Sequence, residues 1–169
     1  KTENIKLEDL EVWNKVEDTN YTTFKYTNGA SFMYPSDWVS KGNETNPAFM
    51  SSDAHSSSVS IASDNVLKEG TSSIITDFES YITFTKLYLT QKMTLLSNIE
   101  EKWINLNGKK ACIINYLTEA EEDDDMKLRV IQVSFEHDKE ISIMTLVVID
   151  KYYDEVKPIF EKMIKSFTK

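Results

Sequence analysis

The pair Asn28-Gly29 lies between two short runs rich in aromatic and β-branched residues, and it constrains the fold more than any other feature. Tyr21–Thr27 precedes the pair and Ala30–Pro35 follows it, each with alternating aromatic side chains that suit a strand with one buried face. Asn-Gly supplies the two positive φ angles of a type I′ turn, so the sequence predicts a β-hairpin. The second strand must end at Pro35 or lie at an edge there, because proline has no N–H to donate.

Trp38 follows the hairpin after only two polar residues. A large aromatic side chain placed just after a turn usually packs back onto the core, because it buries so much apolar area. We therefore interpret Trp38 as a packing anchor, with stacking on a ligand as the alternative.

Six further segments have the composition and alternation of strands. They are residues 48–51, 57–62, 95–106, 109–118, 126–137 and 141–149. Asn107-Gly108 predicts a second hairpin between the third and fourth of them. The apolar run from Ile143 to Ile149 predicts a central strand, covered on both faces.

Two segments have apolar residues at helical spacing. The first runs from about Ser73 to about Lys92, and a capping box formed by Thr76 and Glu79 is predicted at its start. Its apolar stripe is interpreted as a face that packs on the sheet, with an aromatic-rich groove as the alternative, and it consists of Ile74, Phe78, Tyr81, Ile82, Leu89 and Met93. The second has the apolar stripe Val156, Ile159, Phe160, Met163, Ile164 and Phe167. Pro158 is expected in its first turn, where proline is tolerated.

The polar segment Lys1–Asp18 is predicted to be an N-terminal leader or tether that ends in a short helix around Trp13. Residues 19–169 are predicted to form a single domain, a length that can bury a sizeable core without disulfides.

The charge balance excludes whole classes of partner. A net charge of −9 and a pI of about 4.8 argue against nucleic acid and against an anionic membrane surface. Arg129 is the only arginine among nineteen Lys and Arg residues, so bidentate recognition of phosphate has almost no residues to use. Cys112 is the only cysteine and lies in an apolar run, which predicts a buried thiol and no intrachain disulfide.

No motif of catalysis stands out. His55 and His137 are the only histidines, too few for a zinc site without further ligands. Ser51, Ser52 and Ser56–Ser58 lie near His55 and Asp53, but no Gly-x-Ser-x-Gly elbow supports a serine triad. The glycines, at positions 29, 42, 70 and 108, form no phosphate loop. We therefore predict no catalytic, cofactor-binding or metal-binding residue, and no enzyme activity.

One acidic segment could bind a cation. Its members are Glu119, Glu121, Glu122, Asp123, Asp124 and Asp125. It lacks the alternating ligands and central glycine of an EF-hand loop, so any calcium binding is expected to be weak. The preferred interpretation is a solvated connector between strands, extended by the repulsion of like charges.

Three motifs occur in a fixed order along the chain. The hairpin ends in the pattern Phe-x-Tyr-Pro-x-x-Trp at Phe32–Trp38, Asn107-Gly108-Lys109-Lys110-Ala111 enters a strand, and the chain closes on Ile164-Lys165-Ser166-Phe167. Together they resemble the PsbP-like family, to which a small Ran-binding nuclear transport factor is similar in fold. The resemblance covers Thr19 to Phe167 and implies an α/β (α+β) fold, an α/β/α sandwich with a central antiparallel sheet flanked by helices.

The resemblance also implies a function class. Many bacterial members look like secreted or lipid-anchored domains, and catalysis is not a general feature of the family. The family is named for an extrinsic subunit of the photosynthetic oxygen-evolving complex. No residue here matches the cofactor-related residues of that subunit, so its photosynthetic role is not carried over. We expect a non-catalytic, extracytoplasmic, lipid-anchored cell-envelope domain, extracellular after signal-peptide removal, that binds another protein or ligand. It would touch the membrane only through the anchor. The alternatives are a hydrolase or small-ligand-binding protein with an unseen cleft, and an intracellular regulatory binding protein.

Overall fold

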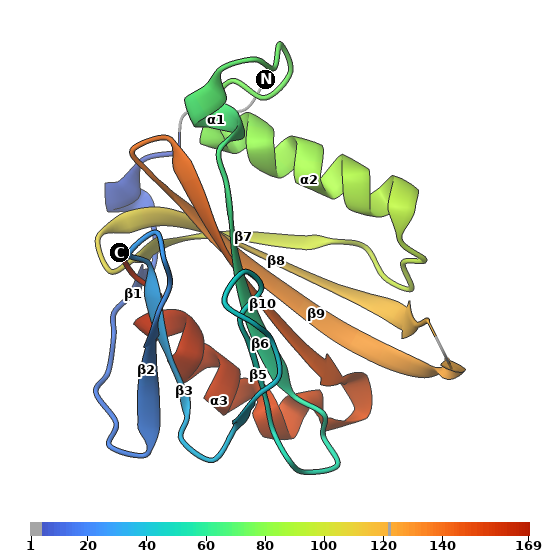
Figure 1. Ribbon diagram of the computed structural model, residues 1–169. Coiled ribbons are helices and arrows are strands. Elements are labelled where there is room, and N and C mark those ends of the chain that lie inside the picture. Colours follow the sequence, from blue (N-terminus) through green and yellow to red (C-terminus); the bar gives the residue numbers. More distant parts are fainter. Residues whose placement is uncertain (1–4, 122) are drawn as a thin grey trace.

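A large twisted sheet with a helix on each face forms the body of the protein in a computed structural model, which describes residues 5–121 and 123–169 (Figure 1). Within these residues the sheet has eight strands in the order β1-β7-β8-β9-β10-β6-β5-β4. All neighbouring pairs are antiparallel except β1 and β7, which are parallel. Strands β2 and β3 pair separately as a two-stranded sheet. The central antiparallel sheet flanked by helices is confirmed.

The elements follow one another along the chain as follows. They are the 3₁₀ helix η1 (Leu7–Asp9), β1 (Val12–Trp13), β2 (Tyr21–Lys25), β3 (Ser31–Pro35), β4 (Val39–Ser40), β5 (Ala48–Met50), β6 (Ser58–Asp64), α1 (Val66–Glu69), α2 (Phe78–Lys92), β7 (Glu100–Leu106), β8 (Lys109–Ala120), β9 (Asp123–His137), β10 (Glu140–Ile149), the 3₁₀ helix η2 (Asp150–Tyr152) and α3 (Tyr153–Ser166). None of the described helices is long and apolar enough to cross a membrane.

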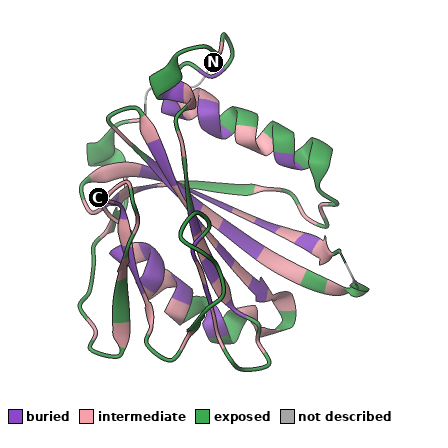
Figure 2. Ribbon diagram, viewed as in Figure 1, coloured by how far each residue is buried: buried purple, intermediate pink, exposed green. Residues whose placement is uncertain are grey.

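Each face of the sheet has its own apolar core. On one face the hairpin β2–β3 and α3 pack on alternate residues of β5 to β10, with Phe32, Phe135 and Phe160 almost completely buried. On the other face α1 and α2 cover residues such as Cys112 and Ile114. Strand β10 contributes to both cores, as expected for a central strand. Figure 2 shows buried residues along the middle of the sheet and exposed residues along the outer side of α2.

The first hairpin is confirmed, but its turn differs from the predicted type. Of its two central residues, only Gly29 has a positive φ, at 90°. Gly29 N–H donates to the carbonyl of Tyr26 (3.0 Å), and Tyr26 N–H donates to that of Ala30 (2.7 Å), which closes a three-residue loop. The Asn28 side chain accepts from Ala30 N–H (2.9 Å) and donates to Ser142 Oγ (3.0 Å), and these bonds tie the turn to β10. The second hairpin has the predicted type I′ turn, with φ of 51° at Asn107 and 87° at Gly108.

Helix α2 begins later than predicted. Its N-cap is Asp77, whose carboxylate accepts from Ser80 N–H (2.7 Å), while Ser80 Oγ accepts from Asp77 N–H (3.0 Å). The capping box is therefore Asp77–Ser80, and the prediction of Thr76 and Glu79 was wrong by one residue. Aspartate outranks threonine as an N-cap, so the helix starts one residue further on. Ile74, predicted on the buried stripe, lies before the helix and is 69% exposed.

Helix α3 confirms the apolar stripe, with Phe160, Met163 and Phe167 at most 1% exposed. It starts at Tyr153, directly after η2, so Pro158 is its sixth residue and not part of the first turn as predicted. Ser166 Oγ accepts from Met33 N–H (2.7 Å), which joins the end of α3 to β3.

The segment before residue 19 contains no α-helix within its described part, so the predicted short helix around Trp13 was wrong. Val12 and Trp13 are residue types that favour strands, and they form β1 beside β7. Asp18 Oδ2 then accepts a 2.6 Å bond from Lys162 Nζ on α3. The division of the chain into a leader and a domain at residue 18 stays a prediction.

The acidic connector is shorter than predicted. Strand β8 continues to Ala120 and β9 begins at Asp123, so Glu119, Asp123 and Asp125 belong to strands. Glu121 lies in the turn, and the predicted connector residue Glu122 lies outside the described residues.

Candidate functional site

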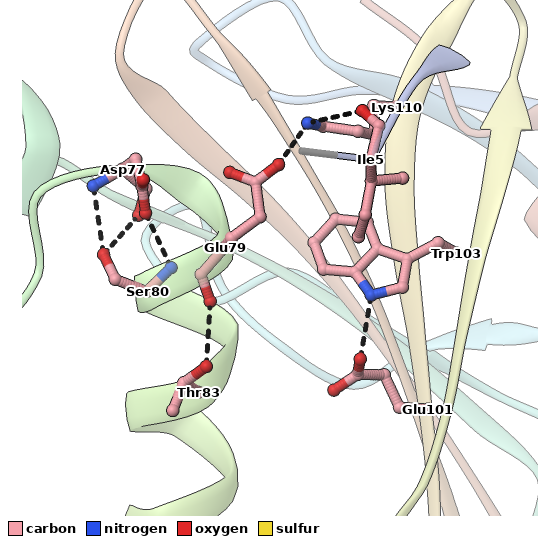
Figure 3. A network of polar contacts seen from close by, with 8 residues as sticks. All are labelled: Ile5, Asp77, Glu79, Ser80, Thr83, Glu101, Trp103 and Lys110. Atoms are coloured by element: carbon pink, nitrogen blue, oxygen red, sulfur yellow. Dashed lines mark hydrogen bonds and ion pairs between the residues drawn. The ribbon is translucent and has the colours of Figure 1, made fainter. Parts of the chain in front are cut away.

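Helix α2 has two unlike flanks, and the one that faces β7 and β8 is charged. Glu79 pairs with Lys110 of β8, and Lys86 Nζ lies 2.6 Å from Glu101 Oε1 of β7. Figure 3 shows Glu79 reaching from the first turn of the helix toward Lys110, which also donates to the carbonyl of Ile5 (3.3 Å). These contacts fix α2 over the β7 side of the sheet.

Trp103 completes this charged flank. Its Nε1 donates to Glu101 Oε2 (2.8 Å), as Figure 3 shows, and its ring meets that of Phe78 edge-on at 5.4 Å. Burial alone would raise the pKa of Glu101, but the hydrogen bonds from Lys86 and Trp103 outweigh burial and lower it. The carboxylate therefore stays ionised and the flank stays paired at neutral pH.

The opposite flank of α2 is apolar and exposed. Phe84, Leu87 and Tyr88 are 38%, 54% and 51% exposed, although all three lie within the helix. Among the described residues, six of the ten large exposed apolar side chains fall between positions 74 and 96. An apolar concentration of this kind marks an interaction surface more often than scattered single residues do.

A groove of about 480 Å³ lies under the apolar flank. We call it the α2 groove, and its lining includes Tyr81, Phe84, Tyr88 and Leu89 of α2 and Gln132 of β9. It is wide enough for several side chains of a partner.

Asp64, the one charged residue among those that line the α2 groove in the described chain, stands on β6. Tyr81 Oη donates to Asp64 Oδ2 (3.4 Å). Burial, reinforced by the nearby Asp64 carboxylate, raises the pKa of Tyr81, so its hydroxyl stays protonated and able to donate. An almost uncharged groove with aromatic walls is suited to apolar contact rather than to proton transfer.

Beyond the groove, uncharged residues of β6 and β10 lie on the same face of the sheet. Ser60 and Ala62 of β6 lie opposite Thr145 and Ile143 of β10, on the face that carries α2. Each of the four is half-buried or exposed, so the face beside α2 is not fully covered by the described chain. A partner resting in the α2 groove would find a continuous uncharged surface there.

The structure brings the suggested triad residues together without forming a triad. Ser51 Oγ donates to Asp53 Oδ1 (2.9 Å), and His55 Nδ1 lies 3.4 Å from Asp53 Oδ2. His55 Nε2 faces Glu155 Oε2 at 3.2 Å, and its ring packs on Tyr152 at 4.5 Å. Both imidazole nitrogens therefore face carboxylates, and neither is placed to take a proton from Ser51. The cluster joins the β5–β6 connection to the start of α3.

Ser52 is exposed, Ser57 N–H donates to Ser51 Oγ (3.0 Å), and Ser56 has a positive φ of 51°. These serines shape the turn between β5 and β6. None of them has a hydrogen bond to His55 among the described contacts.

Trp38 and Cys112 occupy different depths. Trp38 packs against the α3-side core but stays half-buried, so it is a less complete anchor than predicted. Cys112 is fully buried, as predicted, and burial raises the pKa of its thiol. A protonated, inaccessible thiol is neither a nucleophile nor a metal ligand.

Metal-ligand geometry is missing from the described part of the chain, residues 5–121 and 123–169. No three His, Cys, Asp or Glu side chains gather there as ligands. His137 Nε2 lies 3.2 Å from its neighbour Asp138 at the β9–β10 turn.

On this helix the sequence indicated an aromatic-rich groove only as the alternative to a buried stripe, and it did not indicate which residues would line the α2 groove. The sequence showed the buried stripe of the helix, and the signal missed was the set of apolar residues off that stripe: Phe84, Leu87 and Tyr88.

Comparison with protein families gives one match, to the model described as PsbP, over residues 19–169. A search of curated proteins found no match. Solved structures agree on the fold. A Pseudomonas aeruginosa protein of unknown function has a TM-score of 0.62 at 16% identity, with 89% of this chain and 97% of that chain covered.

Two further structures widen the comparison. The cyanobacterial PsbP of Synechocystis has a TM-score of 0.59 at 14% identity, covering 90% of this chain and 94% of its own. The Ran-binding protein Mog1p of Saccharomyces cerevisiae has a TM-score of 0.57 at 9% identity, covering 89% and 96%. At these identities the likeness shows the shared fold.

Proposed function

The chain belongs to the PsbP family, and on that premise we propose that it is a non-catalytic, extracytoplasmic domain that binds another protein through the α2 groove. The observation that carries the proposal is the exposed aromatic flank of α2 above a groove whose one charged lining residue in the described chain is Asp64. Aromatic side chains account for much of the energy of protein interfaces, and an interface core is depleted of charge.

The placement of α2 supports a rigid binding surface. The ion pairs of Glu79 and Lys86 hold its charged flank to β7 and β8, while Phe78 and Ile82 pack below the helix. Phe84 and Tyr88 therefore keep a fixed position relative to the sheet. A preformed surface loses less conformational entropy when a partner binds.

The chemistry of the described residues supports a binding role over catalysis. The histidine nearest to a serine cluster, His55, has a carboxylate at each ring nitrogen, and the thiol of Cys112 is buried. The Ran-binding activity named for the yeast structure is an example of protein binding on this fold.

The extracytoplasmic location and the lipid anchor are part of the proposal. The family resemblance implies secreted or lipid-anchored bacterial members. The net charge of −9 would keep the domain away from anionic headgroups, so its contact with the membrane would depend on the anchor.

Site-specific photocrosslinking tests the surface. p-Benzoylphenylalanine replaces Tyr88 in the groove and, as the matched control, Thr90 on the charged side of the same helix; both positions are exposed. In native cells we expect one discrete crosslinked protein from position 88 and not from position 90. Equal crosslinking from both, or none from position 88, contradicts binding through the α2 groove.

Fractionation of the native cells tests the location. We expect the full-length protein in the membrane fraction, released by detergent and accessible to protease added outside the cytoplasm. Protein found free in the cytosol with its initiator methionine would refute the tethered location and favour the intracellular regulatory alternative.

A further inference from the structure

Strand β7 has an outer edge that the described chain covers at one end only. Strand β1 pairs with Asn105 and Leu106, and η1, upstream of β1, lies near β7 without pairing with it. Ile5 then lies against Lys110 on the α2 face of the sheet. The remaining part of β7, from Glu100 to Ile104, pairs with β8 alone within the described residues.

The register shows which backbone groups point outward. Leu106 and Lys109 flank the two-residue turn, so alternate residues of β7, including Lys102 and Ile104, exchange hydrogen bonds with β8. Asn105 points the other way, and its N–H donates to the carbonyl of Glu11 at 2.9 Å. By the same alternation, the N–H and C=O groups of Glu101 and Trp103 face outward. No hydrogen bond to them occurs within the described chain.

A cleft of about 270 Å³ lies beside this edge, on the face that carries α3. Its apolar lining comes from Ile113 of β8, Ile131 of β9, and Phe160 and Ile164 of α3, while Trp13 of β1 closes one end. The indole of Trp13 shows what the cleft accepts. It is carried by a strand on the edge of β7 and points toward α3, where Lys165 Nζ lies 5.7 Å from the ring centre.

We propose that the free edge of β7 binds an extended segment of a partner protein as an added strand, between β7 and α3. The outward groups of Glu101 and Trp103 recognise the backbone of the segment, and the cleft takes one of its apolar side chains. Alternate side chains of a strand point to the same face, so one apolar residue in every two would suit the cleft. Strand β1 already binds the other end of this edge in the same way.

The charged residues that line the cleft indicate which residues should flank the bound segment. Lys102 of the cleft pairs with Glu11 (2.6 Å), and Glu101 pairs with Lys86. The three other charged lining residues, Glu100, Lys157 and Glu161, form no ion pair among the described residues. The summed charge of these three residues is negative, like the net charge of the whole chain. The cleft therefore favours an apolar segment whose flanking residues are basic rather than acidic.

The edge of β7 and the α2 groove are separate surfaces. The groove lies on the other face, with lining residues from β6, β9, α1 and α2, and the two linings share no residue. Tyr88→Ser should therefore leave binding at the β7 edge unchanged, and failure of one proposal leaves the other standing.

A displayed library of random twelve-residue peptides, selected on the full chain, provides the probe. Glu101→Pro removes the outward N–H, and Glu101→Ala is its matched control because both lose the contacts to Lys86 and Trp103. We expect selected peptides to bind Glu101→Pro at least about tenfold more weakly than they bind Glu101→Ala. Lys157→Trp, which fills the cleft from the exposed side of α3, is a second variant expected to lose binding.

Amide hydrogen exchange tests the same edge of β7 in the protein without substitutions. In the free protein, Lys102 and Ile104 should exchange slowly, and Glu101 and Trp103 quickly; bound peptide should slow the second pair. A library that yields no binder, or peptides that protect other amides or bind Glu101→Pro as well as Glu101→Ala, would overturn the proposal. Protection of Glu101 and Trp103 that rises with protein concentration alone would also overturn it, because the occupant would then be a second copy of the chain.

Discussion

The side-chain amide of Asn107 donates to the carbonyl of Lys165 at 2.8 Å, and so joins the turn between β7 and β8 to the last turn of α3. The same Nδ2 donates to the carbonyl of Phe167 (3.0 Å), and its Oδ1 accepts from Lys15 N–H (2.8 Å). One turn residue thus connects three parts of the chain that are distant in sequence.

Substitution of Asn107 should separate turn geometry from these bonds. Asn107→Gly keeps a residue suited to the positive φ of 51° but leaves three backbone groups without their partner, at a cost of about 1–3 kcal/mol. Asn107→Ala should be less stable still, by roughly 1 kcal/mol, because alanine disfavours that φ. Urea unfolding measures both, and equal midpoints for the two variants would show that the turn relaxes instead.

Asp77 should make the stability of α2 depend on pH. Hydrogen bonds from the backbone and side chain of Ser80 lower the pKa of Asp77 below its ordinary value of 3.8. Because the folded pKa is the lower one, this stabilisation is present above about pH 4 and is lost as the pH falls through the folded value. Asp77→Ala should cost about 1 kcal/mol at pH 7.

Asp77→Asn is the control, since asparagine caps a helix without titrating. Urea midpoints are compared at pH 7 and pH 2.5. The difference in midpoint between the parent and Asp77→Ala should shrink at the lower pH, whereas the difference between Asp77→Asn and Asp77→Ala should persist. An advantage of the parent that stays constant between the two pH values contradicts the role of the carboxylate.

Trp38→Ala should destabilise the protein by less than the truncation of a fully buried aromatic. Such truncations cost about 3–5 kcal/mol, and a half-buried ring should cost roughly half of that. Denaturant unfolding gives the value. A midpoint unchanged from the parent would mean that Trp38 does not anchor the loop, and would revive ligand stacking.

Cys112 should be unreactive in the folded protein. Its side chain is fully buried and its thiol pKa is raised, mainly by burial, so almost no thiolate exists at pH 8. A colorimetric thiol reagent should react with it only after denaturant is added. Rapid reaction under native conditions would reveal that β7 and β8 open far more readily than their packing indicates.

Calcium binding at Glu119–Asp125 is expected to be weak, with a dissociation constant above about 10⁻⁴ M. Glu119, Asp123 and Asp125 lie on paired strands, so their side chains are not arranged around one point as in a calcium loop. Isothermal titration calorimetry with the parent and with Asp123→Asn measures the affinity. Micromolar binding that Asp123→Asn removes would contradict this expectation.

Local signals predicted much of the fold. The two Asn-Gly turns and the stripe on α3 depend on residues within a few positions of one another, so the sequence alone indicates them. Strand pairing between segments far apart in the sequence could not be predicted from such local patterns. That β1 runs parallel to β7, and that β2 and β3 form their own sheet, depend on contacts with segments about 90 to 140 residues away.

The candidate site was harder to predict from the sequence than the fold. Phe84 and Tyr88 are residue types common in cores, and they are exposed because α2 lies over the β7 side of the sheet, where Lys86 pairs with Glu101. At the serine cluster, Ser51, Asp53 and His55 are close in sequence, but Glu155, a hundred residues away, occupies the second imidazole nitrogen. In each case a distant partner decides what a local pattern means.

The position of α3 in the chain has a consequence for how the protein reaches its native state. Phe160, Met163 and Phe167 close the core that β3, β5 and β6 begin, so a polypeptide emerging N-terminus first cannot complete that core until residue 167 is free. Until then the apolar face of the hairpin and sheet remains open to water, and its residues are available to chaperones and to other nascent chains.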